Sequence, residues 1–293
     1  MTHHQIPVPL ERMLSFEDYG SPALDPVLIC HGGPGSRIMQ PLQVQAMQRA
    51  GFRPIGIDRP GYGGTSPWPG RSIGDWTRDG LAVAEYLNLE SFYVAGISTG
   101  ASYALALASV AREQIPGVVI SCGMSDQSWA AEVEDARMDL ADEYWNAENR
   151  AAAIAAAIRQ FGRHGEAQAE QGPDGREIFS PPDRAVLLEG TRQAADPDNT
   201  PFLQGVEGYA DDRIADGPRE GWQSFDVAKI RCPVILVHGE QDWIVPIAQA
   251  RHTAELLDNS ELRTYHQHGH LSVGQEIVSA LVDVRTRAGK EEA

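Results

Sequence analysis

Short apolar runs alternate with stretches of helical period along most of this sequence. The runs lie at 27–30, 52–58, 92–97, 118–122, 234–237 and 262–266, and turn or polar residues follow most of them. Apolar residues recur at helical spacing over 38–50, 75–87, 99–112, 247–257 and 271–285. Continuous apolar strands separated by helices predict an α/β protein, with a mostly parallel, doubly wound sheet covered on both faces and right-handed crossovers.

One segment interrupts this alternation. Residues 126–225 contain no convincing strand, and the sequence indicates helix over 130–158 and 185–193. The segment has 21 acidic residues and nine arginines, so it contributes −12 to the charge of the chain. We therefore expect residues 1–125 and 226–293 to form the α/β core, and residues 126–225 to form a helical cap inserted between two strands.

The composition narrows the classes of partner. The chain has 293 residues, 42% of them hydrophobic, and a formal net charge of −17. So acidic a surface repels nucleic acid and anionic membranes, which leaves a small-molecule substrate as the expected partner. No apolar stretch approaches the roughly 18 residues of a membrane span. Pro7, Pro9 and Glu11 stand where an export signal has its apolar run, so we expect a cytoplasmic protein. The sequence does not indicate an oligomeric state.

The cysteines do not indicate a disulfide framework or a metal site. Cys30, Cys122 and Cys232 are odd in number, and no pair has the spacing of zinc ligands. Two of them end or interrupt apolar runs, which is typical of buried thiols. We expect no metal and no organic cofactor.

Ser98 is the first residue with candidate chemistry. It lies in the segment GISTG (96–100), a G-x-S-x-G pattern that follows an apolar run and precedes an Ala-rich helix. In a sharp strand-to-helix turn, side chains two positions before and after the serine would clash, so Gly96 and Gly100 fit this geometry. The free N–H groups at the start of the helix favour developing negative charge. The pattern predicts Ser98 as a nucleophile.

A serine hydroxyl needs a base to accept its proton. The segment YHQHGHL (265–271) supplies His266, His268 and His270. His266 falls in the predicted strand, and His270 stands at the mouth of the final helix, so we favour His270 over His268. A metal site at these alternating histidines would need further ligands, and no cluster of carboxylates or thiols accompanies them.

The base in turn needs a carboxylate that fixes its tautomer. Asp242 follows the apolar run at 234–237 and should lie at the same edge of the sheet as Ser98. Glu240 and Asp126 are alternatives. The chain order Ser98, Asp242, His270 is the order expected when a nucleophile of this type lies on an α/β sheet.

The segment HGGPG (31–35) offers donors for a tetrahedral oxyanion. Its glycines let the backbone approach a substrate closely, and the N–H groups of Gly33 and Thr99 are the expected oxyanion hole. The segment DRPGYGG (58–64) is expected to order the loop beside it. No substrate-binding residue can be identified from the sequence.

Together these motifs resemble the α/β-hydrolase superfamily, over about 27–122 and 234–285. The resemblance implies the α/β-hydrolase fold with a helical cap, and it places the nucleophile on Ser98, the acid on Asp242, the base on His270 and the oxyanion donors on Gly33 and Thr99. The HGGPG segment is similar to that of proline iminopeptidases. Those enzymes usually carry an aromatic residue after the nucleophile, where this chain has Thr99.

The function expected from these residues is serine hydrolysis through an acyl-enzyme, most simply of small carboxylic esters. A proline iminopeptidase-like aminopeptidase is one alternative, in which carboxylates of the inserted segment would bind the substrate ammonium; Glu132, Glu134, Asp135 and Asp139 are candidates. C–C bond or lactone hydrolysis, cofactor-free halide oxidation and a non-catalytic ligand-binding role remain further alternatives.

Overall fold

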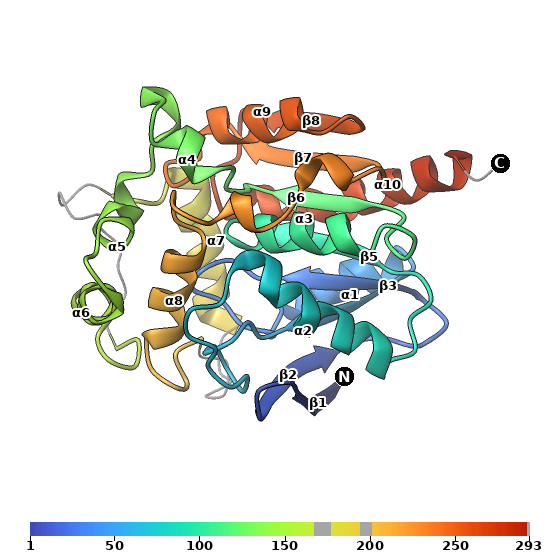
Figure 1. The fold of residues 1–293 in the computed structure, drawn as a ribbon. Coiled ribbons are helices and arrows are strands. Elements are labelled where there is room, and N and C mark those ends of the chain that lie inside the picture. Colours follow the sequence, from blue (N-terminus) through green and yellow to red (C-terminus); the bar gives the residue numbers. More distant parts are fainter. Residues whose placement is uncertain (167–176, 194–200, 292–293) are drawn as a thin grey trace.

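The computed structural model describes residues 1–166, 177–193 and 201–291, and over these residues eight strands form one sheet. The strands are β1 (Thr2–Val8), β2 (Arg12–Asp18), β3 (Asp25–Cys30), β4 (Phe52–Ile57), β5 (Tyr93–Ile97), β6 (Val118–Ser121), β7 (Val234–Gly239) and β8 (Ser260–Tyr265). Their order is β1-β2-β4-β3-β5-β6-β7-β8, antiparallel at β1-β2-β4 and parallel from β4 to β8. The predicted α/β class and mostly parallel sheet are confirmed (Figure 1).

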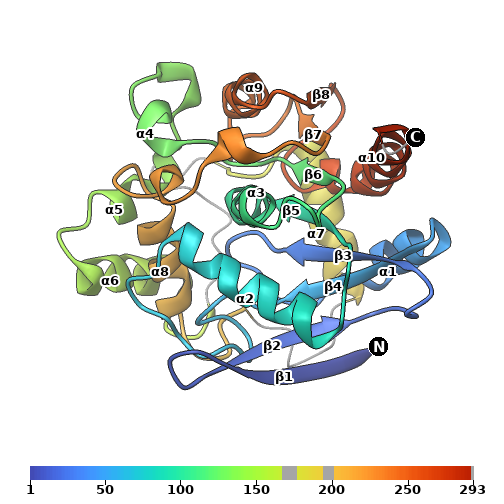
Figure 2. The same ribbon diagram turned by 45° about the vertical axis from the view of Figure 1, so that its right-hand side comes forward.

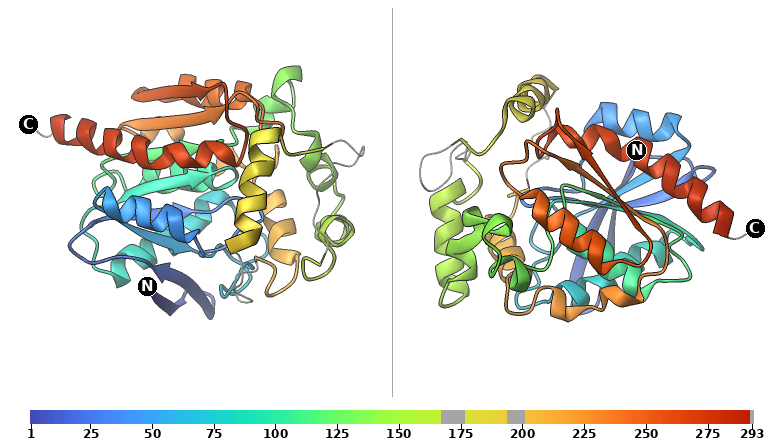
Figure 3. Two further views of the ribbon diagram at one scale, coloured as in Figure 1. Left: turned by 180° about the vertical axis from the view of Figure 1, so that it is seen from behind. Right: turned by 90° about the horizontal axis from the view of Figure 1, so that it is seen from above.

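Helices cover both faces of the sheet. One core joins the sheet to α2 (Ile73–Tyr86) and α3 (Gly100–Val110), with α9 (Ile247–Leu256) packed beside β7 and β8. A second core joins the other face to α1 (Pro41–Arg49) and α10 (Ile277–Glu291), which lie in front in the left view of Figure 3. No helix in the described ranges combines the length and apolar character that crossing a membrane requires.

The apolar runs form strands because the two faces of a strand pack into different hydrophobic cores. In β3, Leu28 and Cys30 belong to the core under α2 and α3, whereas Val27 and Ile29 belong to the core under α1 and α10. Successive side chains of a strand point to opposite faces, so a strand buried on both faces is apolar at every position. This is the pattern that the sequence showed.

The first two strands were not predicted. The buried positions of β2 include Ser15, Glu17 and Asp18, which interrupt the apolar pattern. Asp18 is paired with Arg53 of β4, with its Oδ1 2.9 Å from Arg53 Nε. A buried carboxylate needs such a partner, and here the partner lies 35 residues away in the sequence.

Between β6 and β7 lies the inserted segment, residues 126–225, in which the described residues form helices and turns. It contains α4 (Gln127–Ala130), α5 (Asp142–Trp145), α6 (Arg150–Phe161), α7 (Pro181–Gln193) and α8 (Glu207–Ala215). Figures 1 and 2 show these helices beyond the carboxyl ends of the parallel strands. Residues 167–176 and 194–200 lie outside the described part.

The inserted segment differs from the prediction in two ways. The helix expected over 130–158 is divided into α4, two 3-10 turns, α5 and α6. The Ala-rich stretch forms α6, which begins where Asn149 Oδ1 accepts a hydrogen bond from Ala152 N at 3.1 Å. Helix α8 was missed because its sequence EGYADDRIA is strongly polar, although most of its residues are buried.

Candidate active site

Ser98 lies in the tight turn between β5 and α3. Its φ of +54° is in the left-handed region, which non-glycine residues rarely adopt. The turn is fixed to the neighbouring strand, because Ser98 N donates to Ser121 O at 2.9 Å and Met124 N donates to Ser98 O at 3.3 Å. Strained backbone of this kind is concentrated at functional sites.

The two glycines of the GISTG segment leave no room for side chains. A Cβ on Gly96 would lie 2.6 Å from Gly100 O, and a Cβ on Gly100 would lie 2.0 Å from Cys30 O. Helix α3 therefore begins in direct contact with the end of β3, as the G-x-S-x-G pattern indicated.

His270 and Asp242 are in contact. His270 Nδ1 lies 2.8 Å from Asp242 Oδ2. The other carboxylate oxygen of Asp242 accepts hydrogen bonds from Ile244 N at 2.9 Å and Val245 N at 2.8 Å, so the carboxylate has a fixed orientation. Burial alone would lower the pKa of His270, but the Asp242 carboxylate and the neighbouring Cys122 together outweigh burial and raise this pKa well above its ordinary value.

The alternative residues from the sequence have other partners. Glu240 is bound to Thr264 and His266 at the protein surface. Asp126 accepts from Ser128 N at 2.9 Å at the start of α4. His268 lies beside Gln275, with 3.2 Å between its Nδ1 and the amide nitrogen. None of the three contacts His270 among the described residues.

The Ser98 hydroxyl has no hydrogen-bond partner among the described residues. The side chain is 7% exposed, as is that of His270. Asp242 and His270 form the pair that the sequence predicted, and Ser98 lies at the end of β5, two strands from β7 in the sheet order.

The two predicted oxyanion donors lie close together. A Cβ on Gly33 would be 3.1 Å from Thr99 Oγ1, and a Cβ on the adjacent Gly32 would be 3.5 Å from Ser98 Cβ. Within the described ranges, neither the Gly33 N–H nor the Thr99 N–H donates a hydrogen bond. Free N–H groups beside a nucleophile are the arrangement that stabilises an oxyanion.

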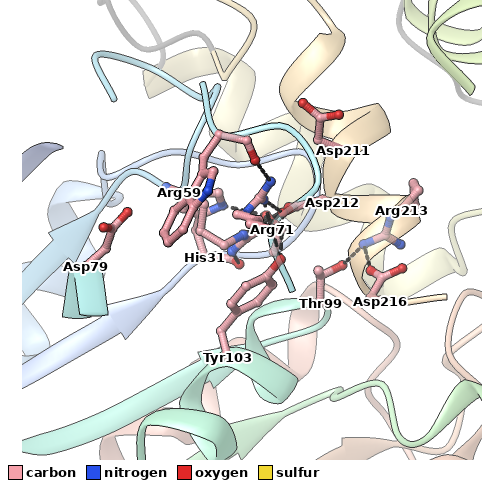
Figure 4. Close-up of polar contacts among 12 residues, drawn as sticks. His31, Arg59, Arg71, Asp79, Thr99, Tyr103, Asp211, Asp212, Arg213 and Asp216 are labelled. Atoms are coloured by element: carbon pink, nitrogen blue, oxygen red, sulfur yellow. Dashed lines mark hydrogen bonds and ion pairs between the residues drawn. The ribbon is translucent and has the colours of Figure 1, made fainter. Parts of the chain in front are cut away.

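Arg59 fixes the loop that carries Gly33. Its guanidinium donates to His31 O and, at 2.9 Å, to Gly32 O, and its backbone N donates to His31 Nε2 at 3.1 Å. The same side chain pairs with Asp212 of α8 at 2.7 Å (Figure 4). The DRPGYGG segment thus orders the HGGPG loop, as expected, and also connects it to the inserted segment.

Asp183 is a further residue at the site that the sequence did not indicate. It lies in the first turn of α7, is fully buried, and accepts hydrogen bonds from His270 N at 2.7 Å, Leu271 N at 2.9 Å and Ser272 N at 2.9 Å. One carboxylate of the inserted segment therefore holds the backbone on which His270 stands. Asp183 and His270 are 87 positions apart, so no local pattern in the sequence indicates their contact.

Cys122 also lies beside the His–Asp pair. Its Sγ, a ring nitrogen of His270 and a carboxylate oxygen of Asp242 are within 4.8 Å of one another. These are ligand types that zinc accepts. The Asp242 carboxylate already accepts from the His270 ring and from two backbone N–H groups, which fits a role in orienting the ring better than a role as a metal ligand.

The four acidic residues that the sequence offered for binding a substrate ammonium are not buried. Glu132, Glu134, Asp135 and Asp139 are all exposed. A cavity of about 110 Å³ lies nearby in the inserted segment, between α4 and α5, and Met138, Trp145 and Pro218 are among its lining residues. None of the five predicted site residues lines this cavity.

Comparison with known proteins identifies the family. The family model described as alpha/beta hydrolase fold matches residues 25–276. The chain is 27% identical to a non-heme chloroperoxidase of Burkholderia pyrrocinia, over 90% of this chain and 92% of that protein. It is 25% identical to a proline iminopeptidase of Neisseria gonorrhoeae, over 92% and 91% respectively. It is also 25% identical to a bifunctional esterase/perhydrolase of Acinetobacter calcoaceticus, over 85% and 86%.

Solved structures show the same fold. A structure from work on carboxylesterases of the thaumarchaeon Nitrososphaera gargenis superimposes with a TM-score of 0.73 at 18% identity, over 98% of this chain and 100% of that one. The chain belongs to the α/β-hydrolase family. Within that family it is similar to proteins described as a chloroperoxidase, an esterase/perhydrolase and an iminopeptidase.

Proposed function

We propose that the protein is a serine hydrolase that cleaves small carboxylic esters through an acyl-enzyme intermediate. The observation that carries the proposal is the combination of Ser98 in a left-handed turn with the Asp242–His270 pair, whose nitrogen and oxygen are 2.8 Å apart. The unpaired N–H groups of Gly33 and Thr99 support it. The esterase among the relatives agrees with this reaction class.

In the proposed reaction, neutral His270 accepts the Ser98 proton while Ser98 Oγ attacks the ester carbonyl. Gly33 N–H and Thr99 N–H stabilise the oxyanion, and protonated His270 then donates its proton to the leaving alcohol. Water, deprotonated by His270, attacks the acyl-enzyme and releases the acid and the free Ser98 hydroxyl. Asp242 holds the ring with Nδ1 protonated and stabilises its positive charge.

We also propose that the inserted segment, residues 126–225, serves as the cap over this site. The contacts of Asp183 with the His270 backbone and of Asp212 with Arg59 support this role, because both carboxylates belong to the inserted segment. Side chains of the segment would then determine which esters are accepted.

The test is hydrolysis of p-nitrophenyl esters of increasing acyl length by the wild type and by Ser98→Ala. The matched control is Ser109→Ala, since Ser109 is a buried serine of α3 whose hydroxyl donates to Ala106 O at 2.7 Å. We expect turnover by the wild type and by Ser109→Ala, with loss in Ser98→Ala. A fluorophosphonate probe should label the first two proteins only. Labelling that persists in Ser98→Ala would contradict the proposal.

A second candidate is the aminopeptidase reaction, favoured by the HGGPG segment and by the iminopeptidase relative. It needs a carboxylate to receive the substrate ammonium. Prolyl and other aminoacyl anilides in the same assay distinguish the two reactions: faster turnover of anilides than of esters would favour the peptidase.

A further inference from the structure

The inserted segment brings a buried positive charge to the residues around Ser98. Arg213 of α8 donates from Nη2 to Thr99 Oγ1, and the same nitrogen pairs with Asp216 (Figure 4). Its Nη1 lies 3.7 Å from the sulfur of Met124. The side chain is only 4% exposed, so this charge acts in a dehydrated environment.

The Arg213 guanidinium lies close to residues of the proposed reaction centre. Thr99 directly follows Ser98, and a Cβ on Gly33 would lie 3.3 Å from Arg213 Nη2. Met124 donates its backbone N–H to Ser98 O. Arg213 thus contacts Thr99, one of the two expected oxyanion residues, and lies beside the other, Gly33.

The donors of Arg213 are incompletely satisfied. A guanidinium has five N–H donors, and buried donors without acceptors are costly. Within the described part of the chain, Arg213 Nε has no partner, and Nη1 has only a thioether sulfur, which is a weak acceptor. The carboxylate of Asp216, which pairs with Arg213, is itself buried at a cost to its charged form. Burial raises the pKa of Asp216 to about 6, although Arg213 opposes this rise.

We propose that Arg213 is a specificity-determining residue that binds a carboxylate on the acyl part of the substrate, so that half-esters of dicarboxylic acids are the preferred substrate class. The inference rests on the proposed function. A substrate carboxylate would supply acceptors for guanidinium donors that lack them in the free protein, and guanidinium groups form charge-assisted hydrogen bonds with carboxylates. Asp216, held by Trp145 Nε1 at 3.1 Å, keeps the guanidinium in place in the free protein and competes with the substrate for it.

The test compares each monomethyl dicarboxylate, from malonate to adipate, with its neutral amide isostere, in which a carboxamide replaces the free acid. Turnover is followed by pH-stat titration for wild type, Arg213→Gln and Asp216→Asn. We expect the wild type to prefer the best half-ester by about 10- to 100-fold in kcat/KM, the range of a charge-assisted hydrogen bond. Arg213→Gln should lose this preference, mainly through a higher KM for the half-ester.

Asp216→Asn separates a binding role from a purely structural one. Removing the competing carboxylate should lower KM for the half-ester relative to KM for the amide. If Asp216→Asn instead weakens both substrates as much as Arg213→Gln does, the ion pair is structural and the inference fails. If either single variant does not fold, the double variant Arg213→Gln/Asp216→Asn, which buries no unpaired charge, takes its place and should show no preference.

A binding measurement keeps this inference distinct from the proposed function. Calorimetry of the half-ester with Ser98→Ala, with and without Arg213→Gln, needs no turnover. Wild-type hydrolysis of both substrates without preference would overturn the inference alone. Absence of hydrolysis and of fluorophosphonate labelling would overturn the proposed function alone, provided that Arg213→Gln still weakens half-ester binding. Equal binding with and without Arg213→Gln would overturn the inference in either case.

Discussion

A protonated imidazole cannot accept the proton of a serine hydroxyl, so the charge of His270 determines the pH range of the proposed reaction. The Asp242 carboxylate favours the charged ring and raises the pKa of His270, against the effect of burial. The same carboxylate that orients the base therefore also makes it easier to protonate. The enzyme should lose activity at a pH where an isolated histidine would still be mostly neutral.

We accordingly expect kcat/KM for a neutral p-nitrophenyl ester to rise with pH through an apparent pKa above 6.5, the ordinary value of histidine. In Asp242→Asn, kcat should fall by about 10⁴, because the ring loses its correct tautomer. NMR titration of the His270 ring should show a lower pKa in this variant. Asp126→Asn, which removes one of the two alternatives to Asp242 that the sequence offered, should leave both quantities unchanged.

The His270 pKa also enters the free energy of unfolding. A histidine whose pKa is higher in the folded state adds stability that is fully present below its unfolded pKa, about 6.5. This stability is lost as the pH rises through the folded-state pKa. Urea unfolding should therefore show a larger loss of stability for Asp242→Asn below pH 6.5 than above the folded-state pKa. A difference in stability between the wild type and Asp242→Asn that does not change with pH would contradict the raised pKa of His270.

Asp183 acts on the position of His270, since it binds backbone and not the ring. We expect Asp183→Asn to lower kcat, by up to about 10²-fold for a displacement of about 1 Å, with little change in KM. Asp183→Ala should be more severe, because the amide oxygen of asparagine still accepts one of the hydrogen bonds. Amide exchange at residues 270–272 should become faster in both variants. An unchanged kcat with faster exchange would exclude the positioning role.

At the scale of elements, one buried carboxylate of α8, Asp212, joins this helix to the α/β core. Asp212 Oδ2 accepts from Arg59 Nε at 2.9 Å, while Oδ1 accepts from Tyr103 OH at 2.9 Å and from Arg71. Burial would raise the pKa of Asp212, but Arg59 and Arg71 outweigh burial and hold this pKa far below its usual range. The stability that this carboxylate adds is present above its unfolded pKa and is lost only as the pH falls through the depressed folded pKa.

Asp212→Ala should destabilise the protein by about 3–5 kcal/mol, because it leaves two buried guanidinium groups without a counter-charge. Asp211→Ala is the matched control on the same helix, since its partner Arg150 is 40% exposed and can be solvated. We expect a smaller effect there, near the 1 kcal/mol or so of exposed pairs. Urea unfolding at neutral pH measures the loss of stability in each variant. Equal losses in Asp212→Ala and Asp211→Ala would show that the burial of Arg59 and Arg71 does not determine the size of the effect.

For the molecule as a whole, these contacts should couple the inserted segment to the sheet. Asp183 connects it to the loop after β8, and Asp212 connects it to Arg59 in the loop after β4, which in turn binds the loop after β3. We expect the wild type to unfold in one transition, with coincident curves from tryptophan fluorescence and far-UV circular dichroism. Asp212→Ala should broaden or separate the two curves. Separate transitions in the wild type would contradict this coupling.

The sequence predicted those features that depend on local pattern. The six apolar runs became β3 to β8, and the GISTG segment became a turn in which Gly96 and Gly100 are sterically required. The spacing of His270 and Asp242 after strand ends anticipated their contact. Polar residues that are buried with distant partners were missed. Asp212 lies 153 residues from Arg59, so nothing in the local sequence of α8 indicated that this carboxylate is buried.

The contacts of Asp183 and Asp212 limit how the inserted segment could be exchanged. A designer who transplants this region from a relative, to change substrate preference, would also remove the acceptor for the backbone at 270–272 and the counter-charge of Arg59 and Arg71. A replacement segment must supply both carboxylates at the same places. Otherwise a graft intended to alter selectivity would also disorder the proposed base, His270, and the HGGPG loop of the recipient.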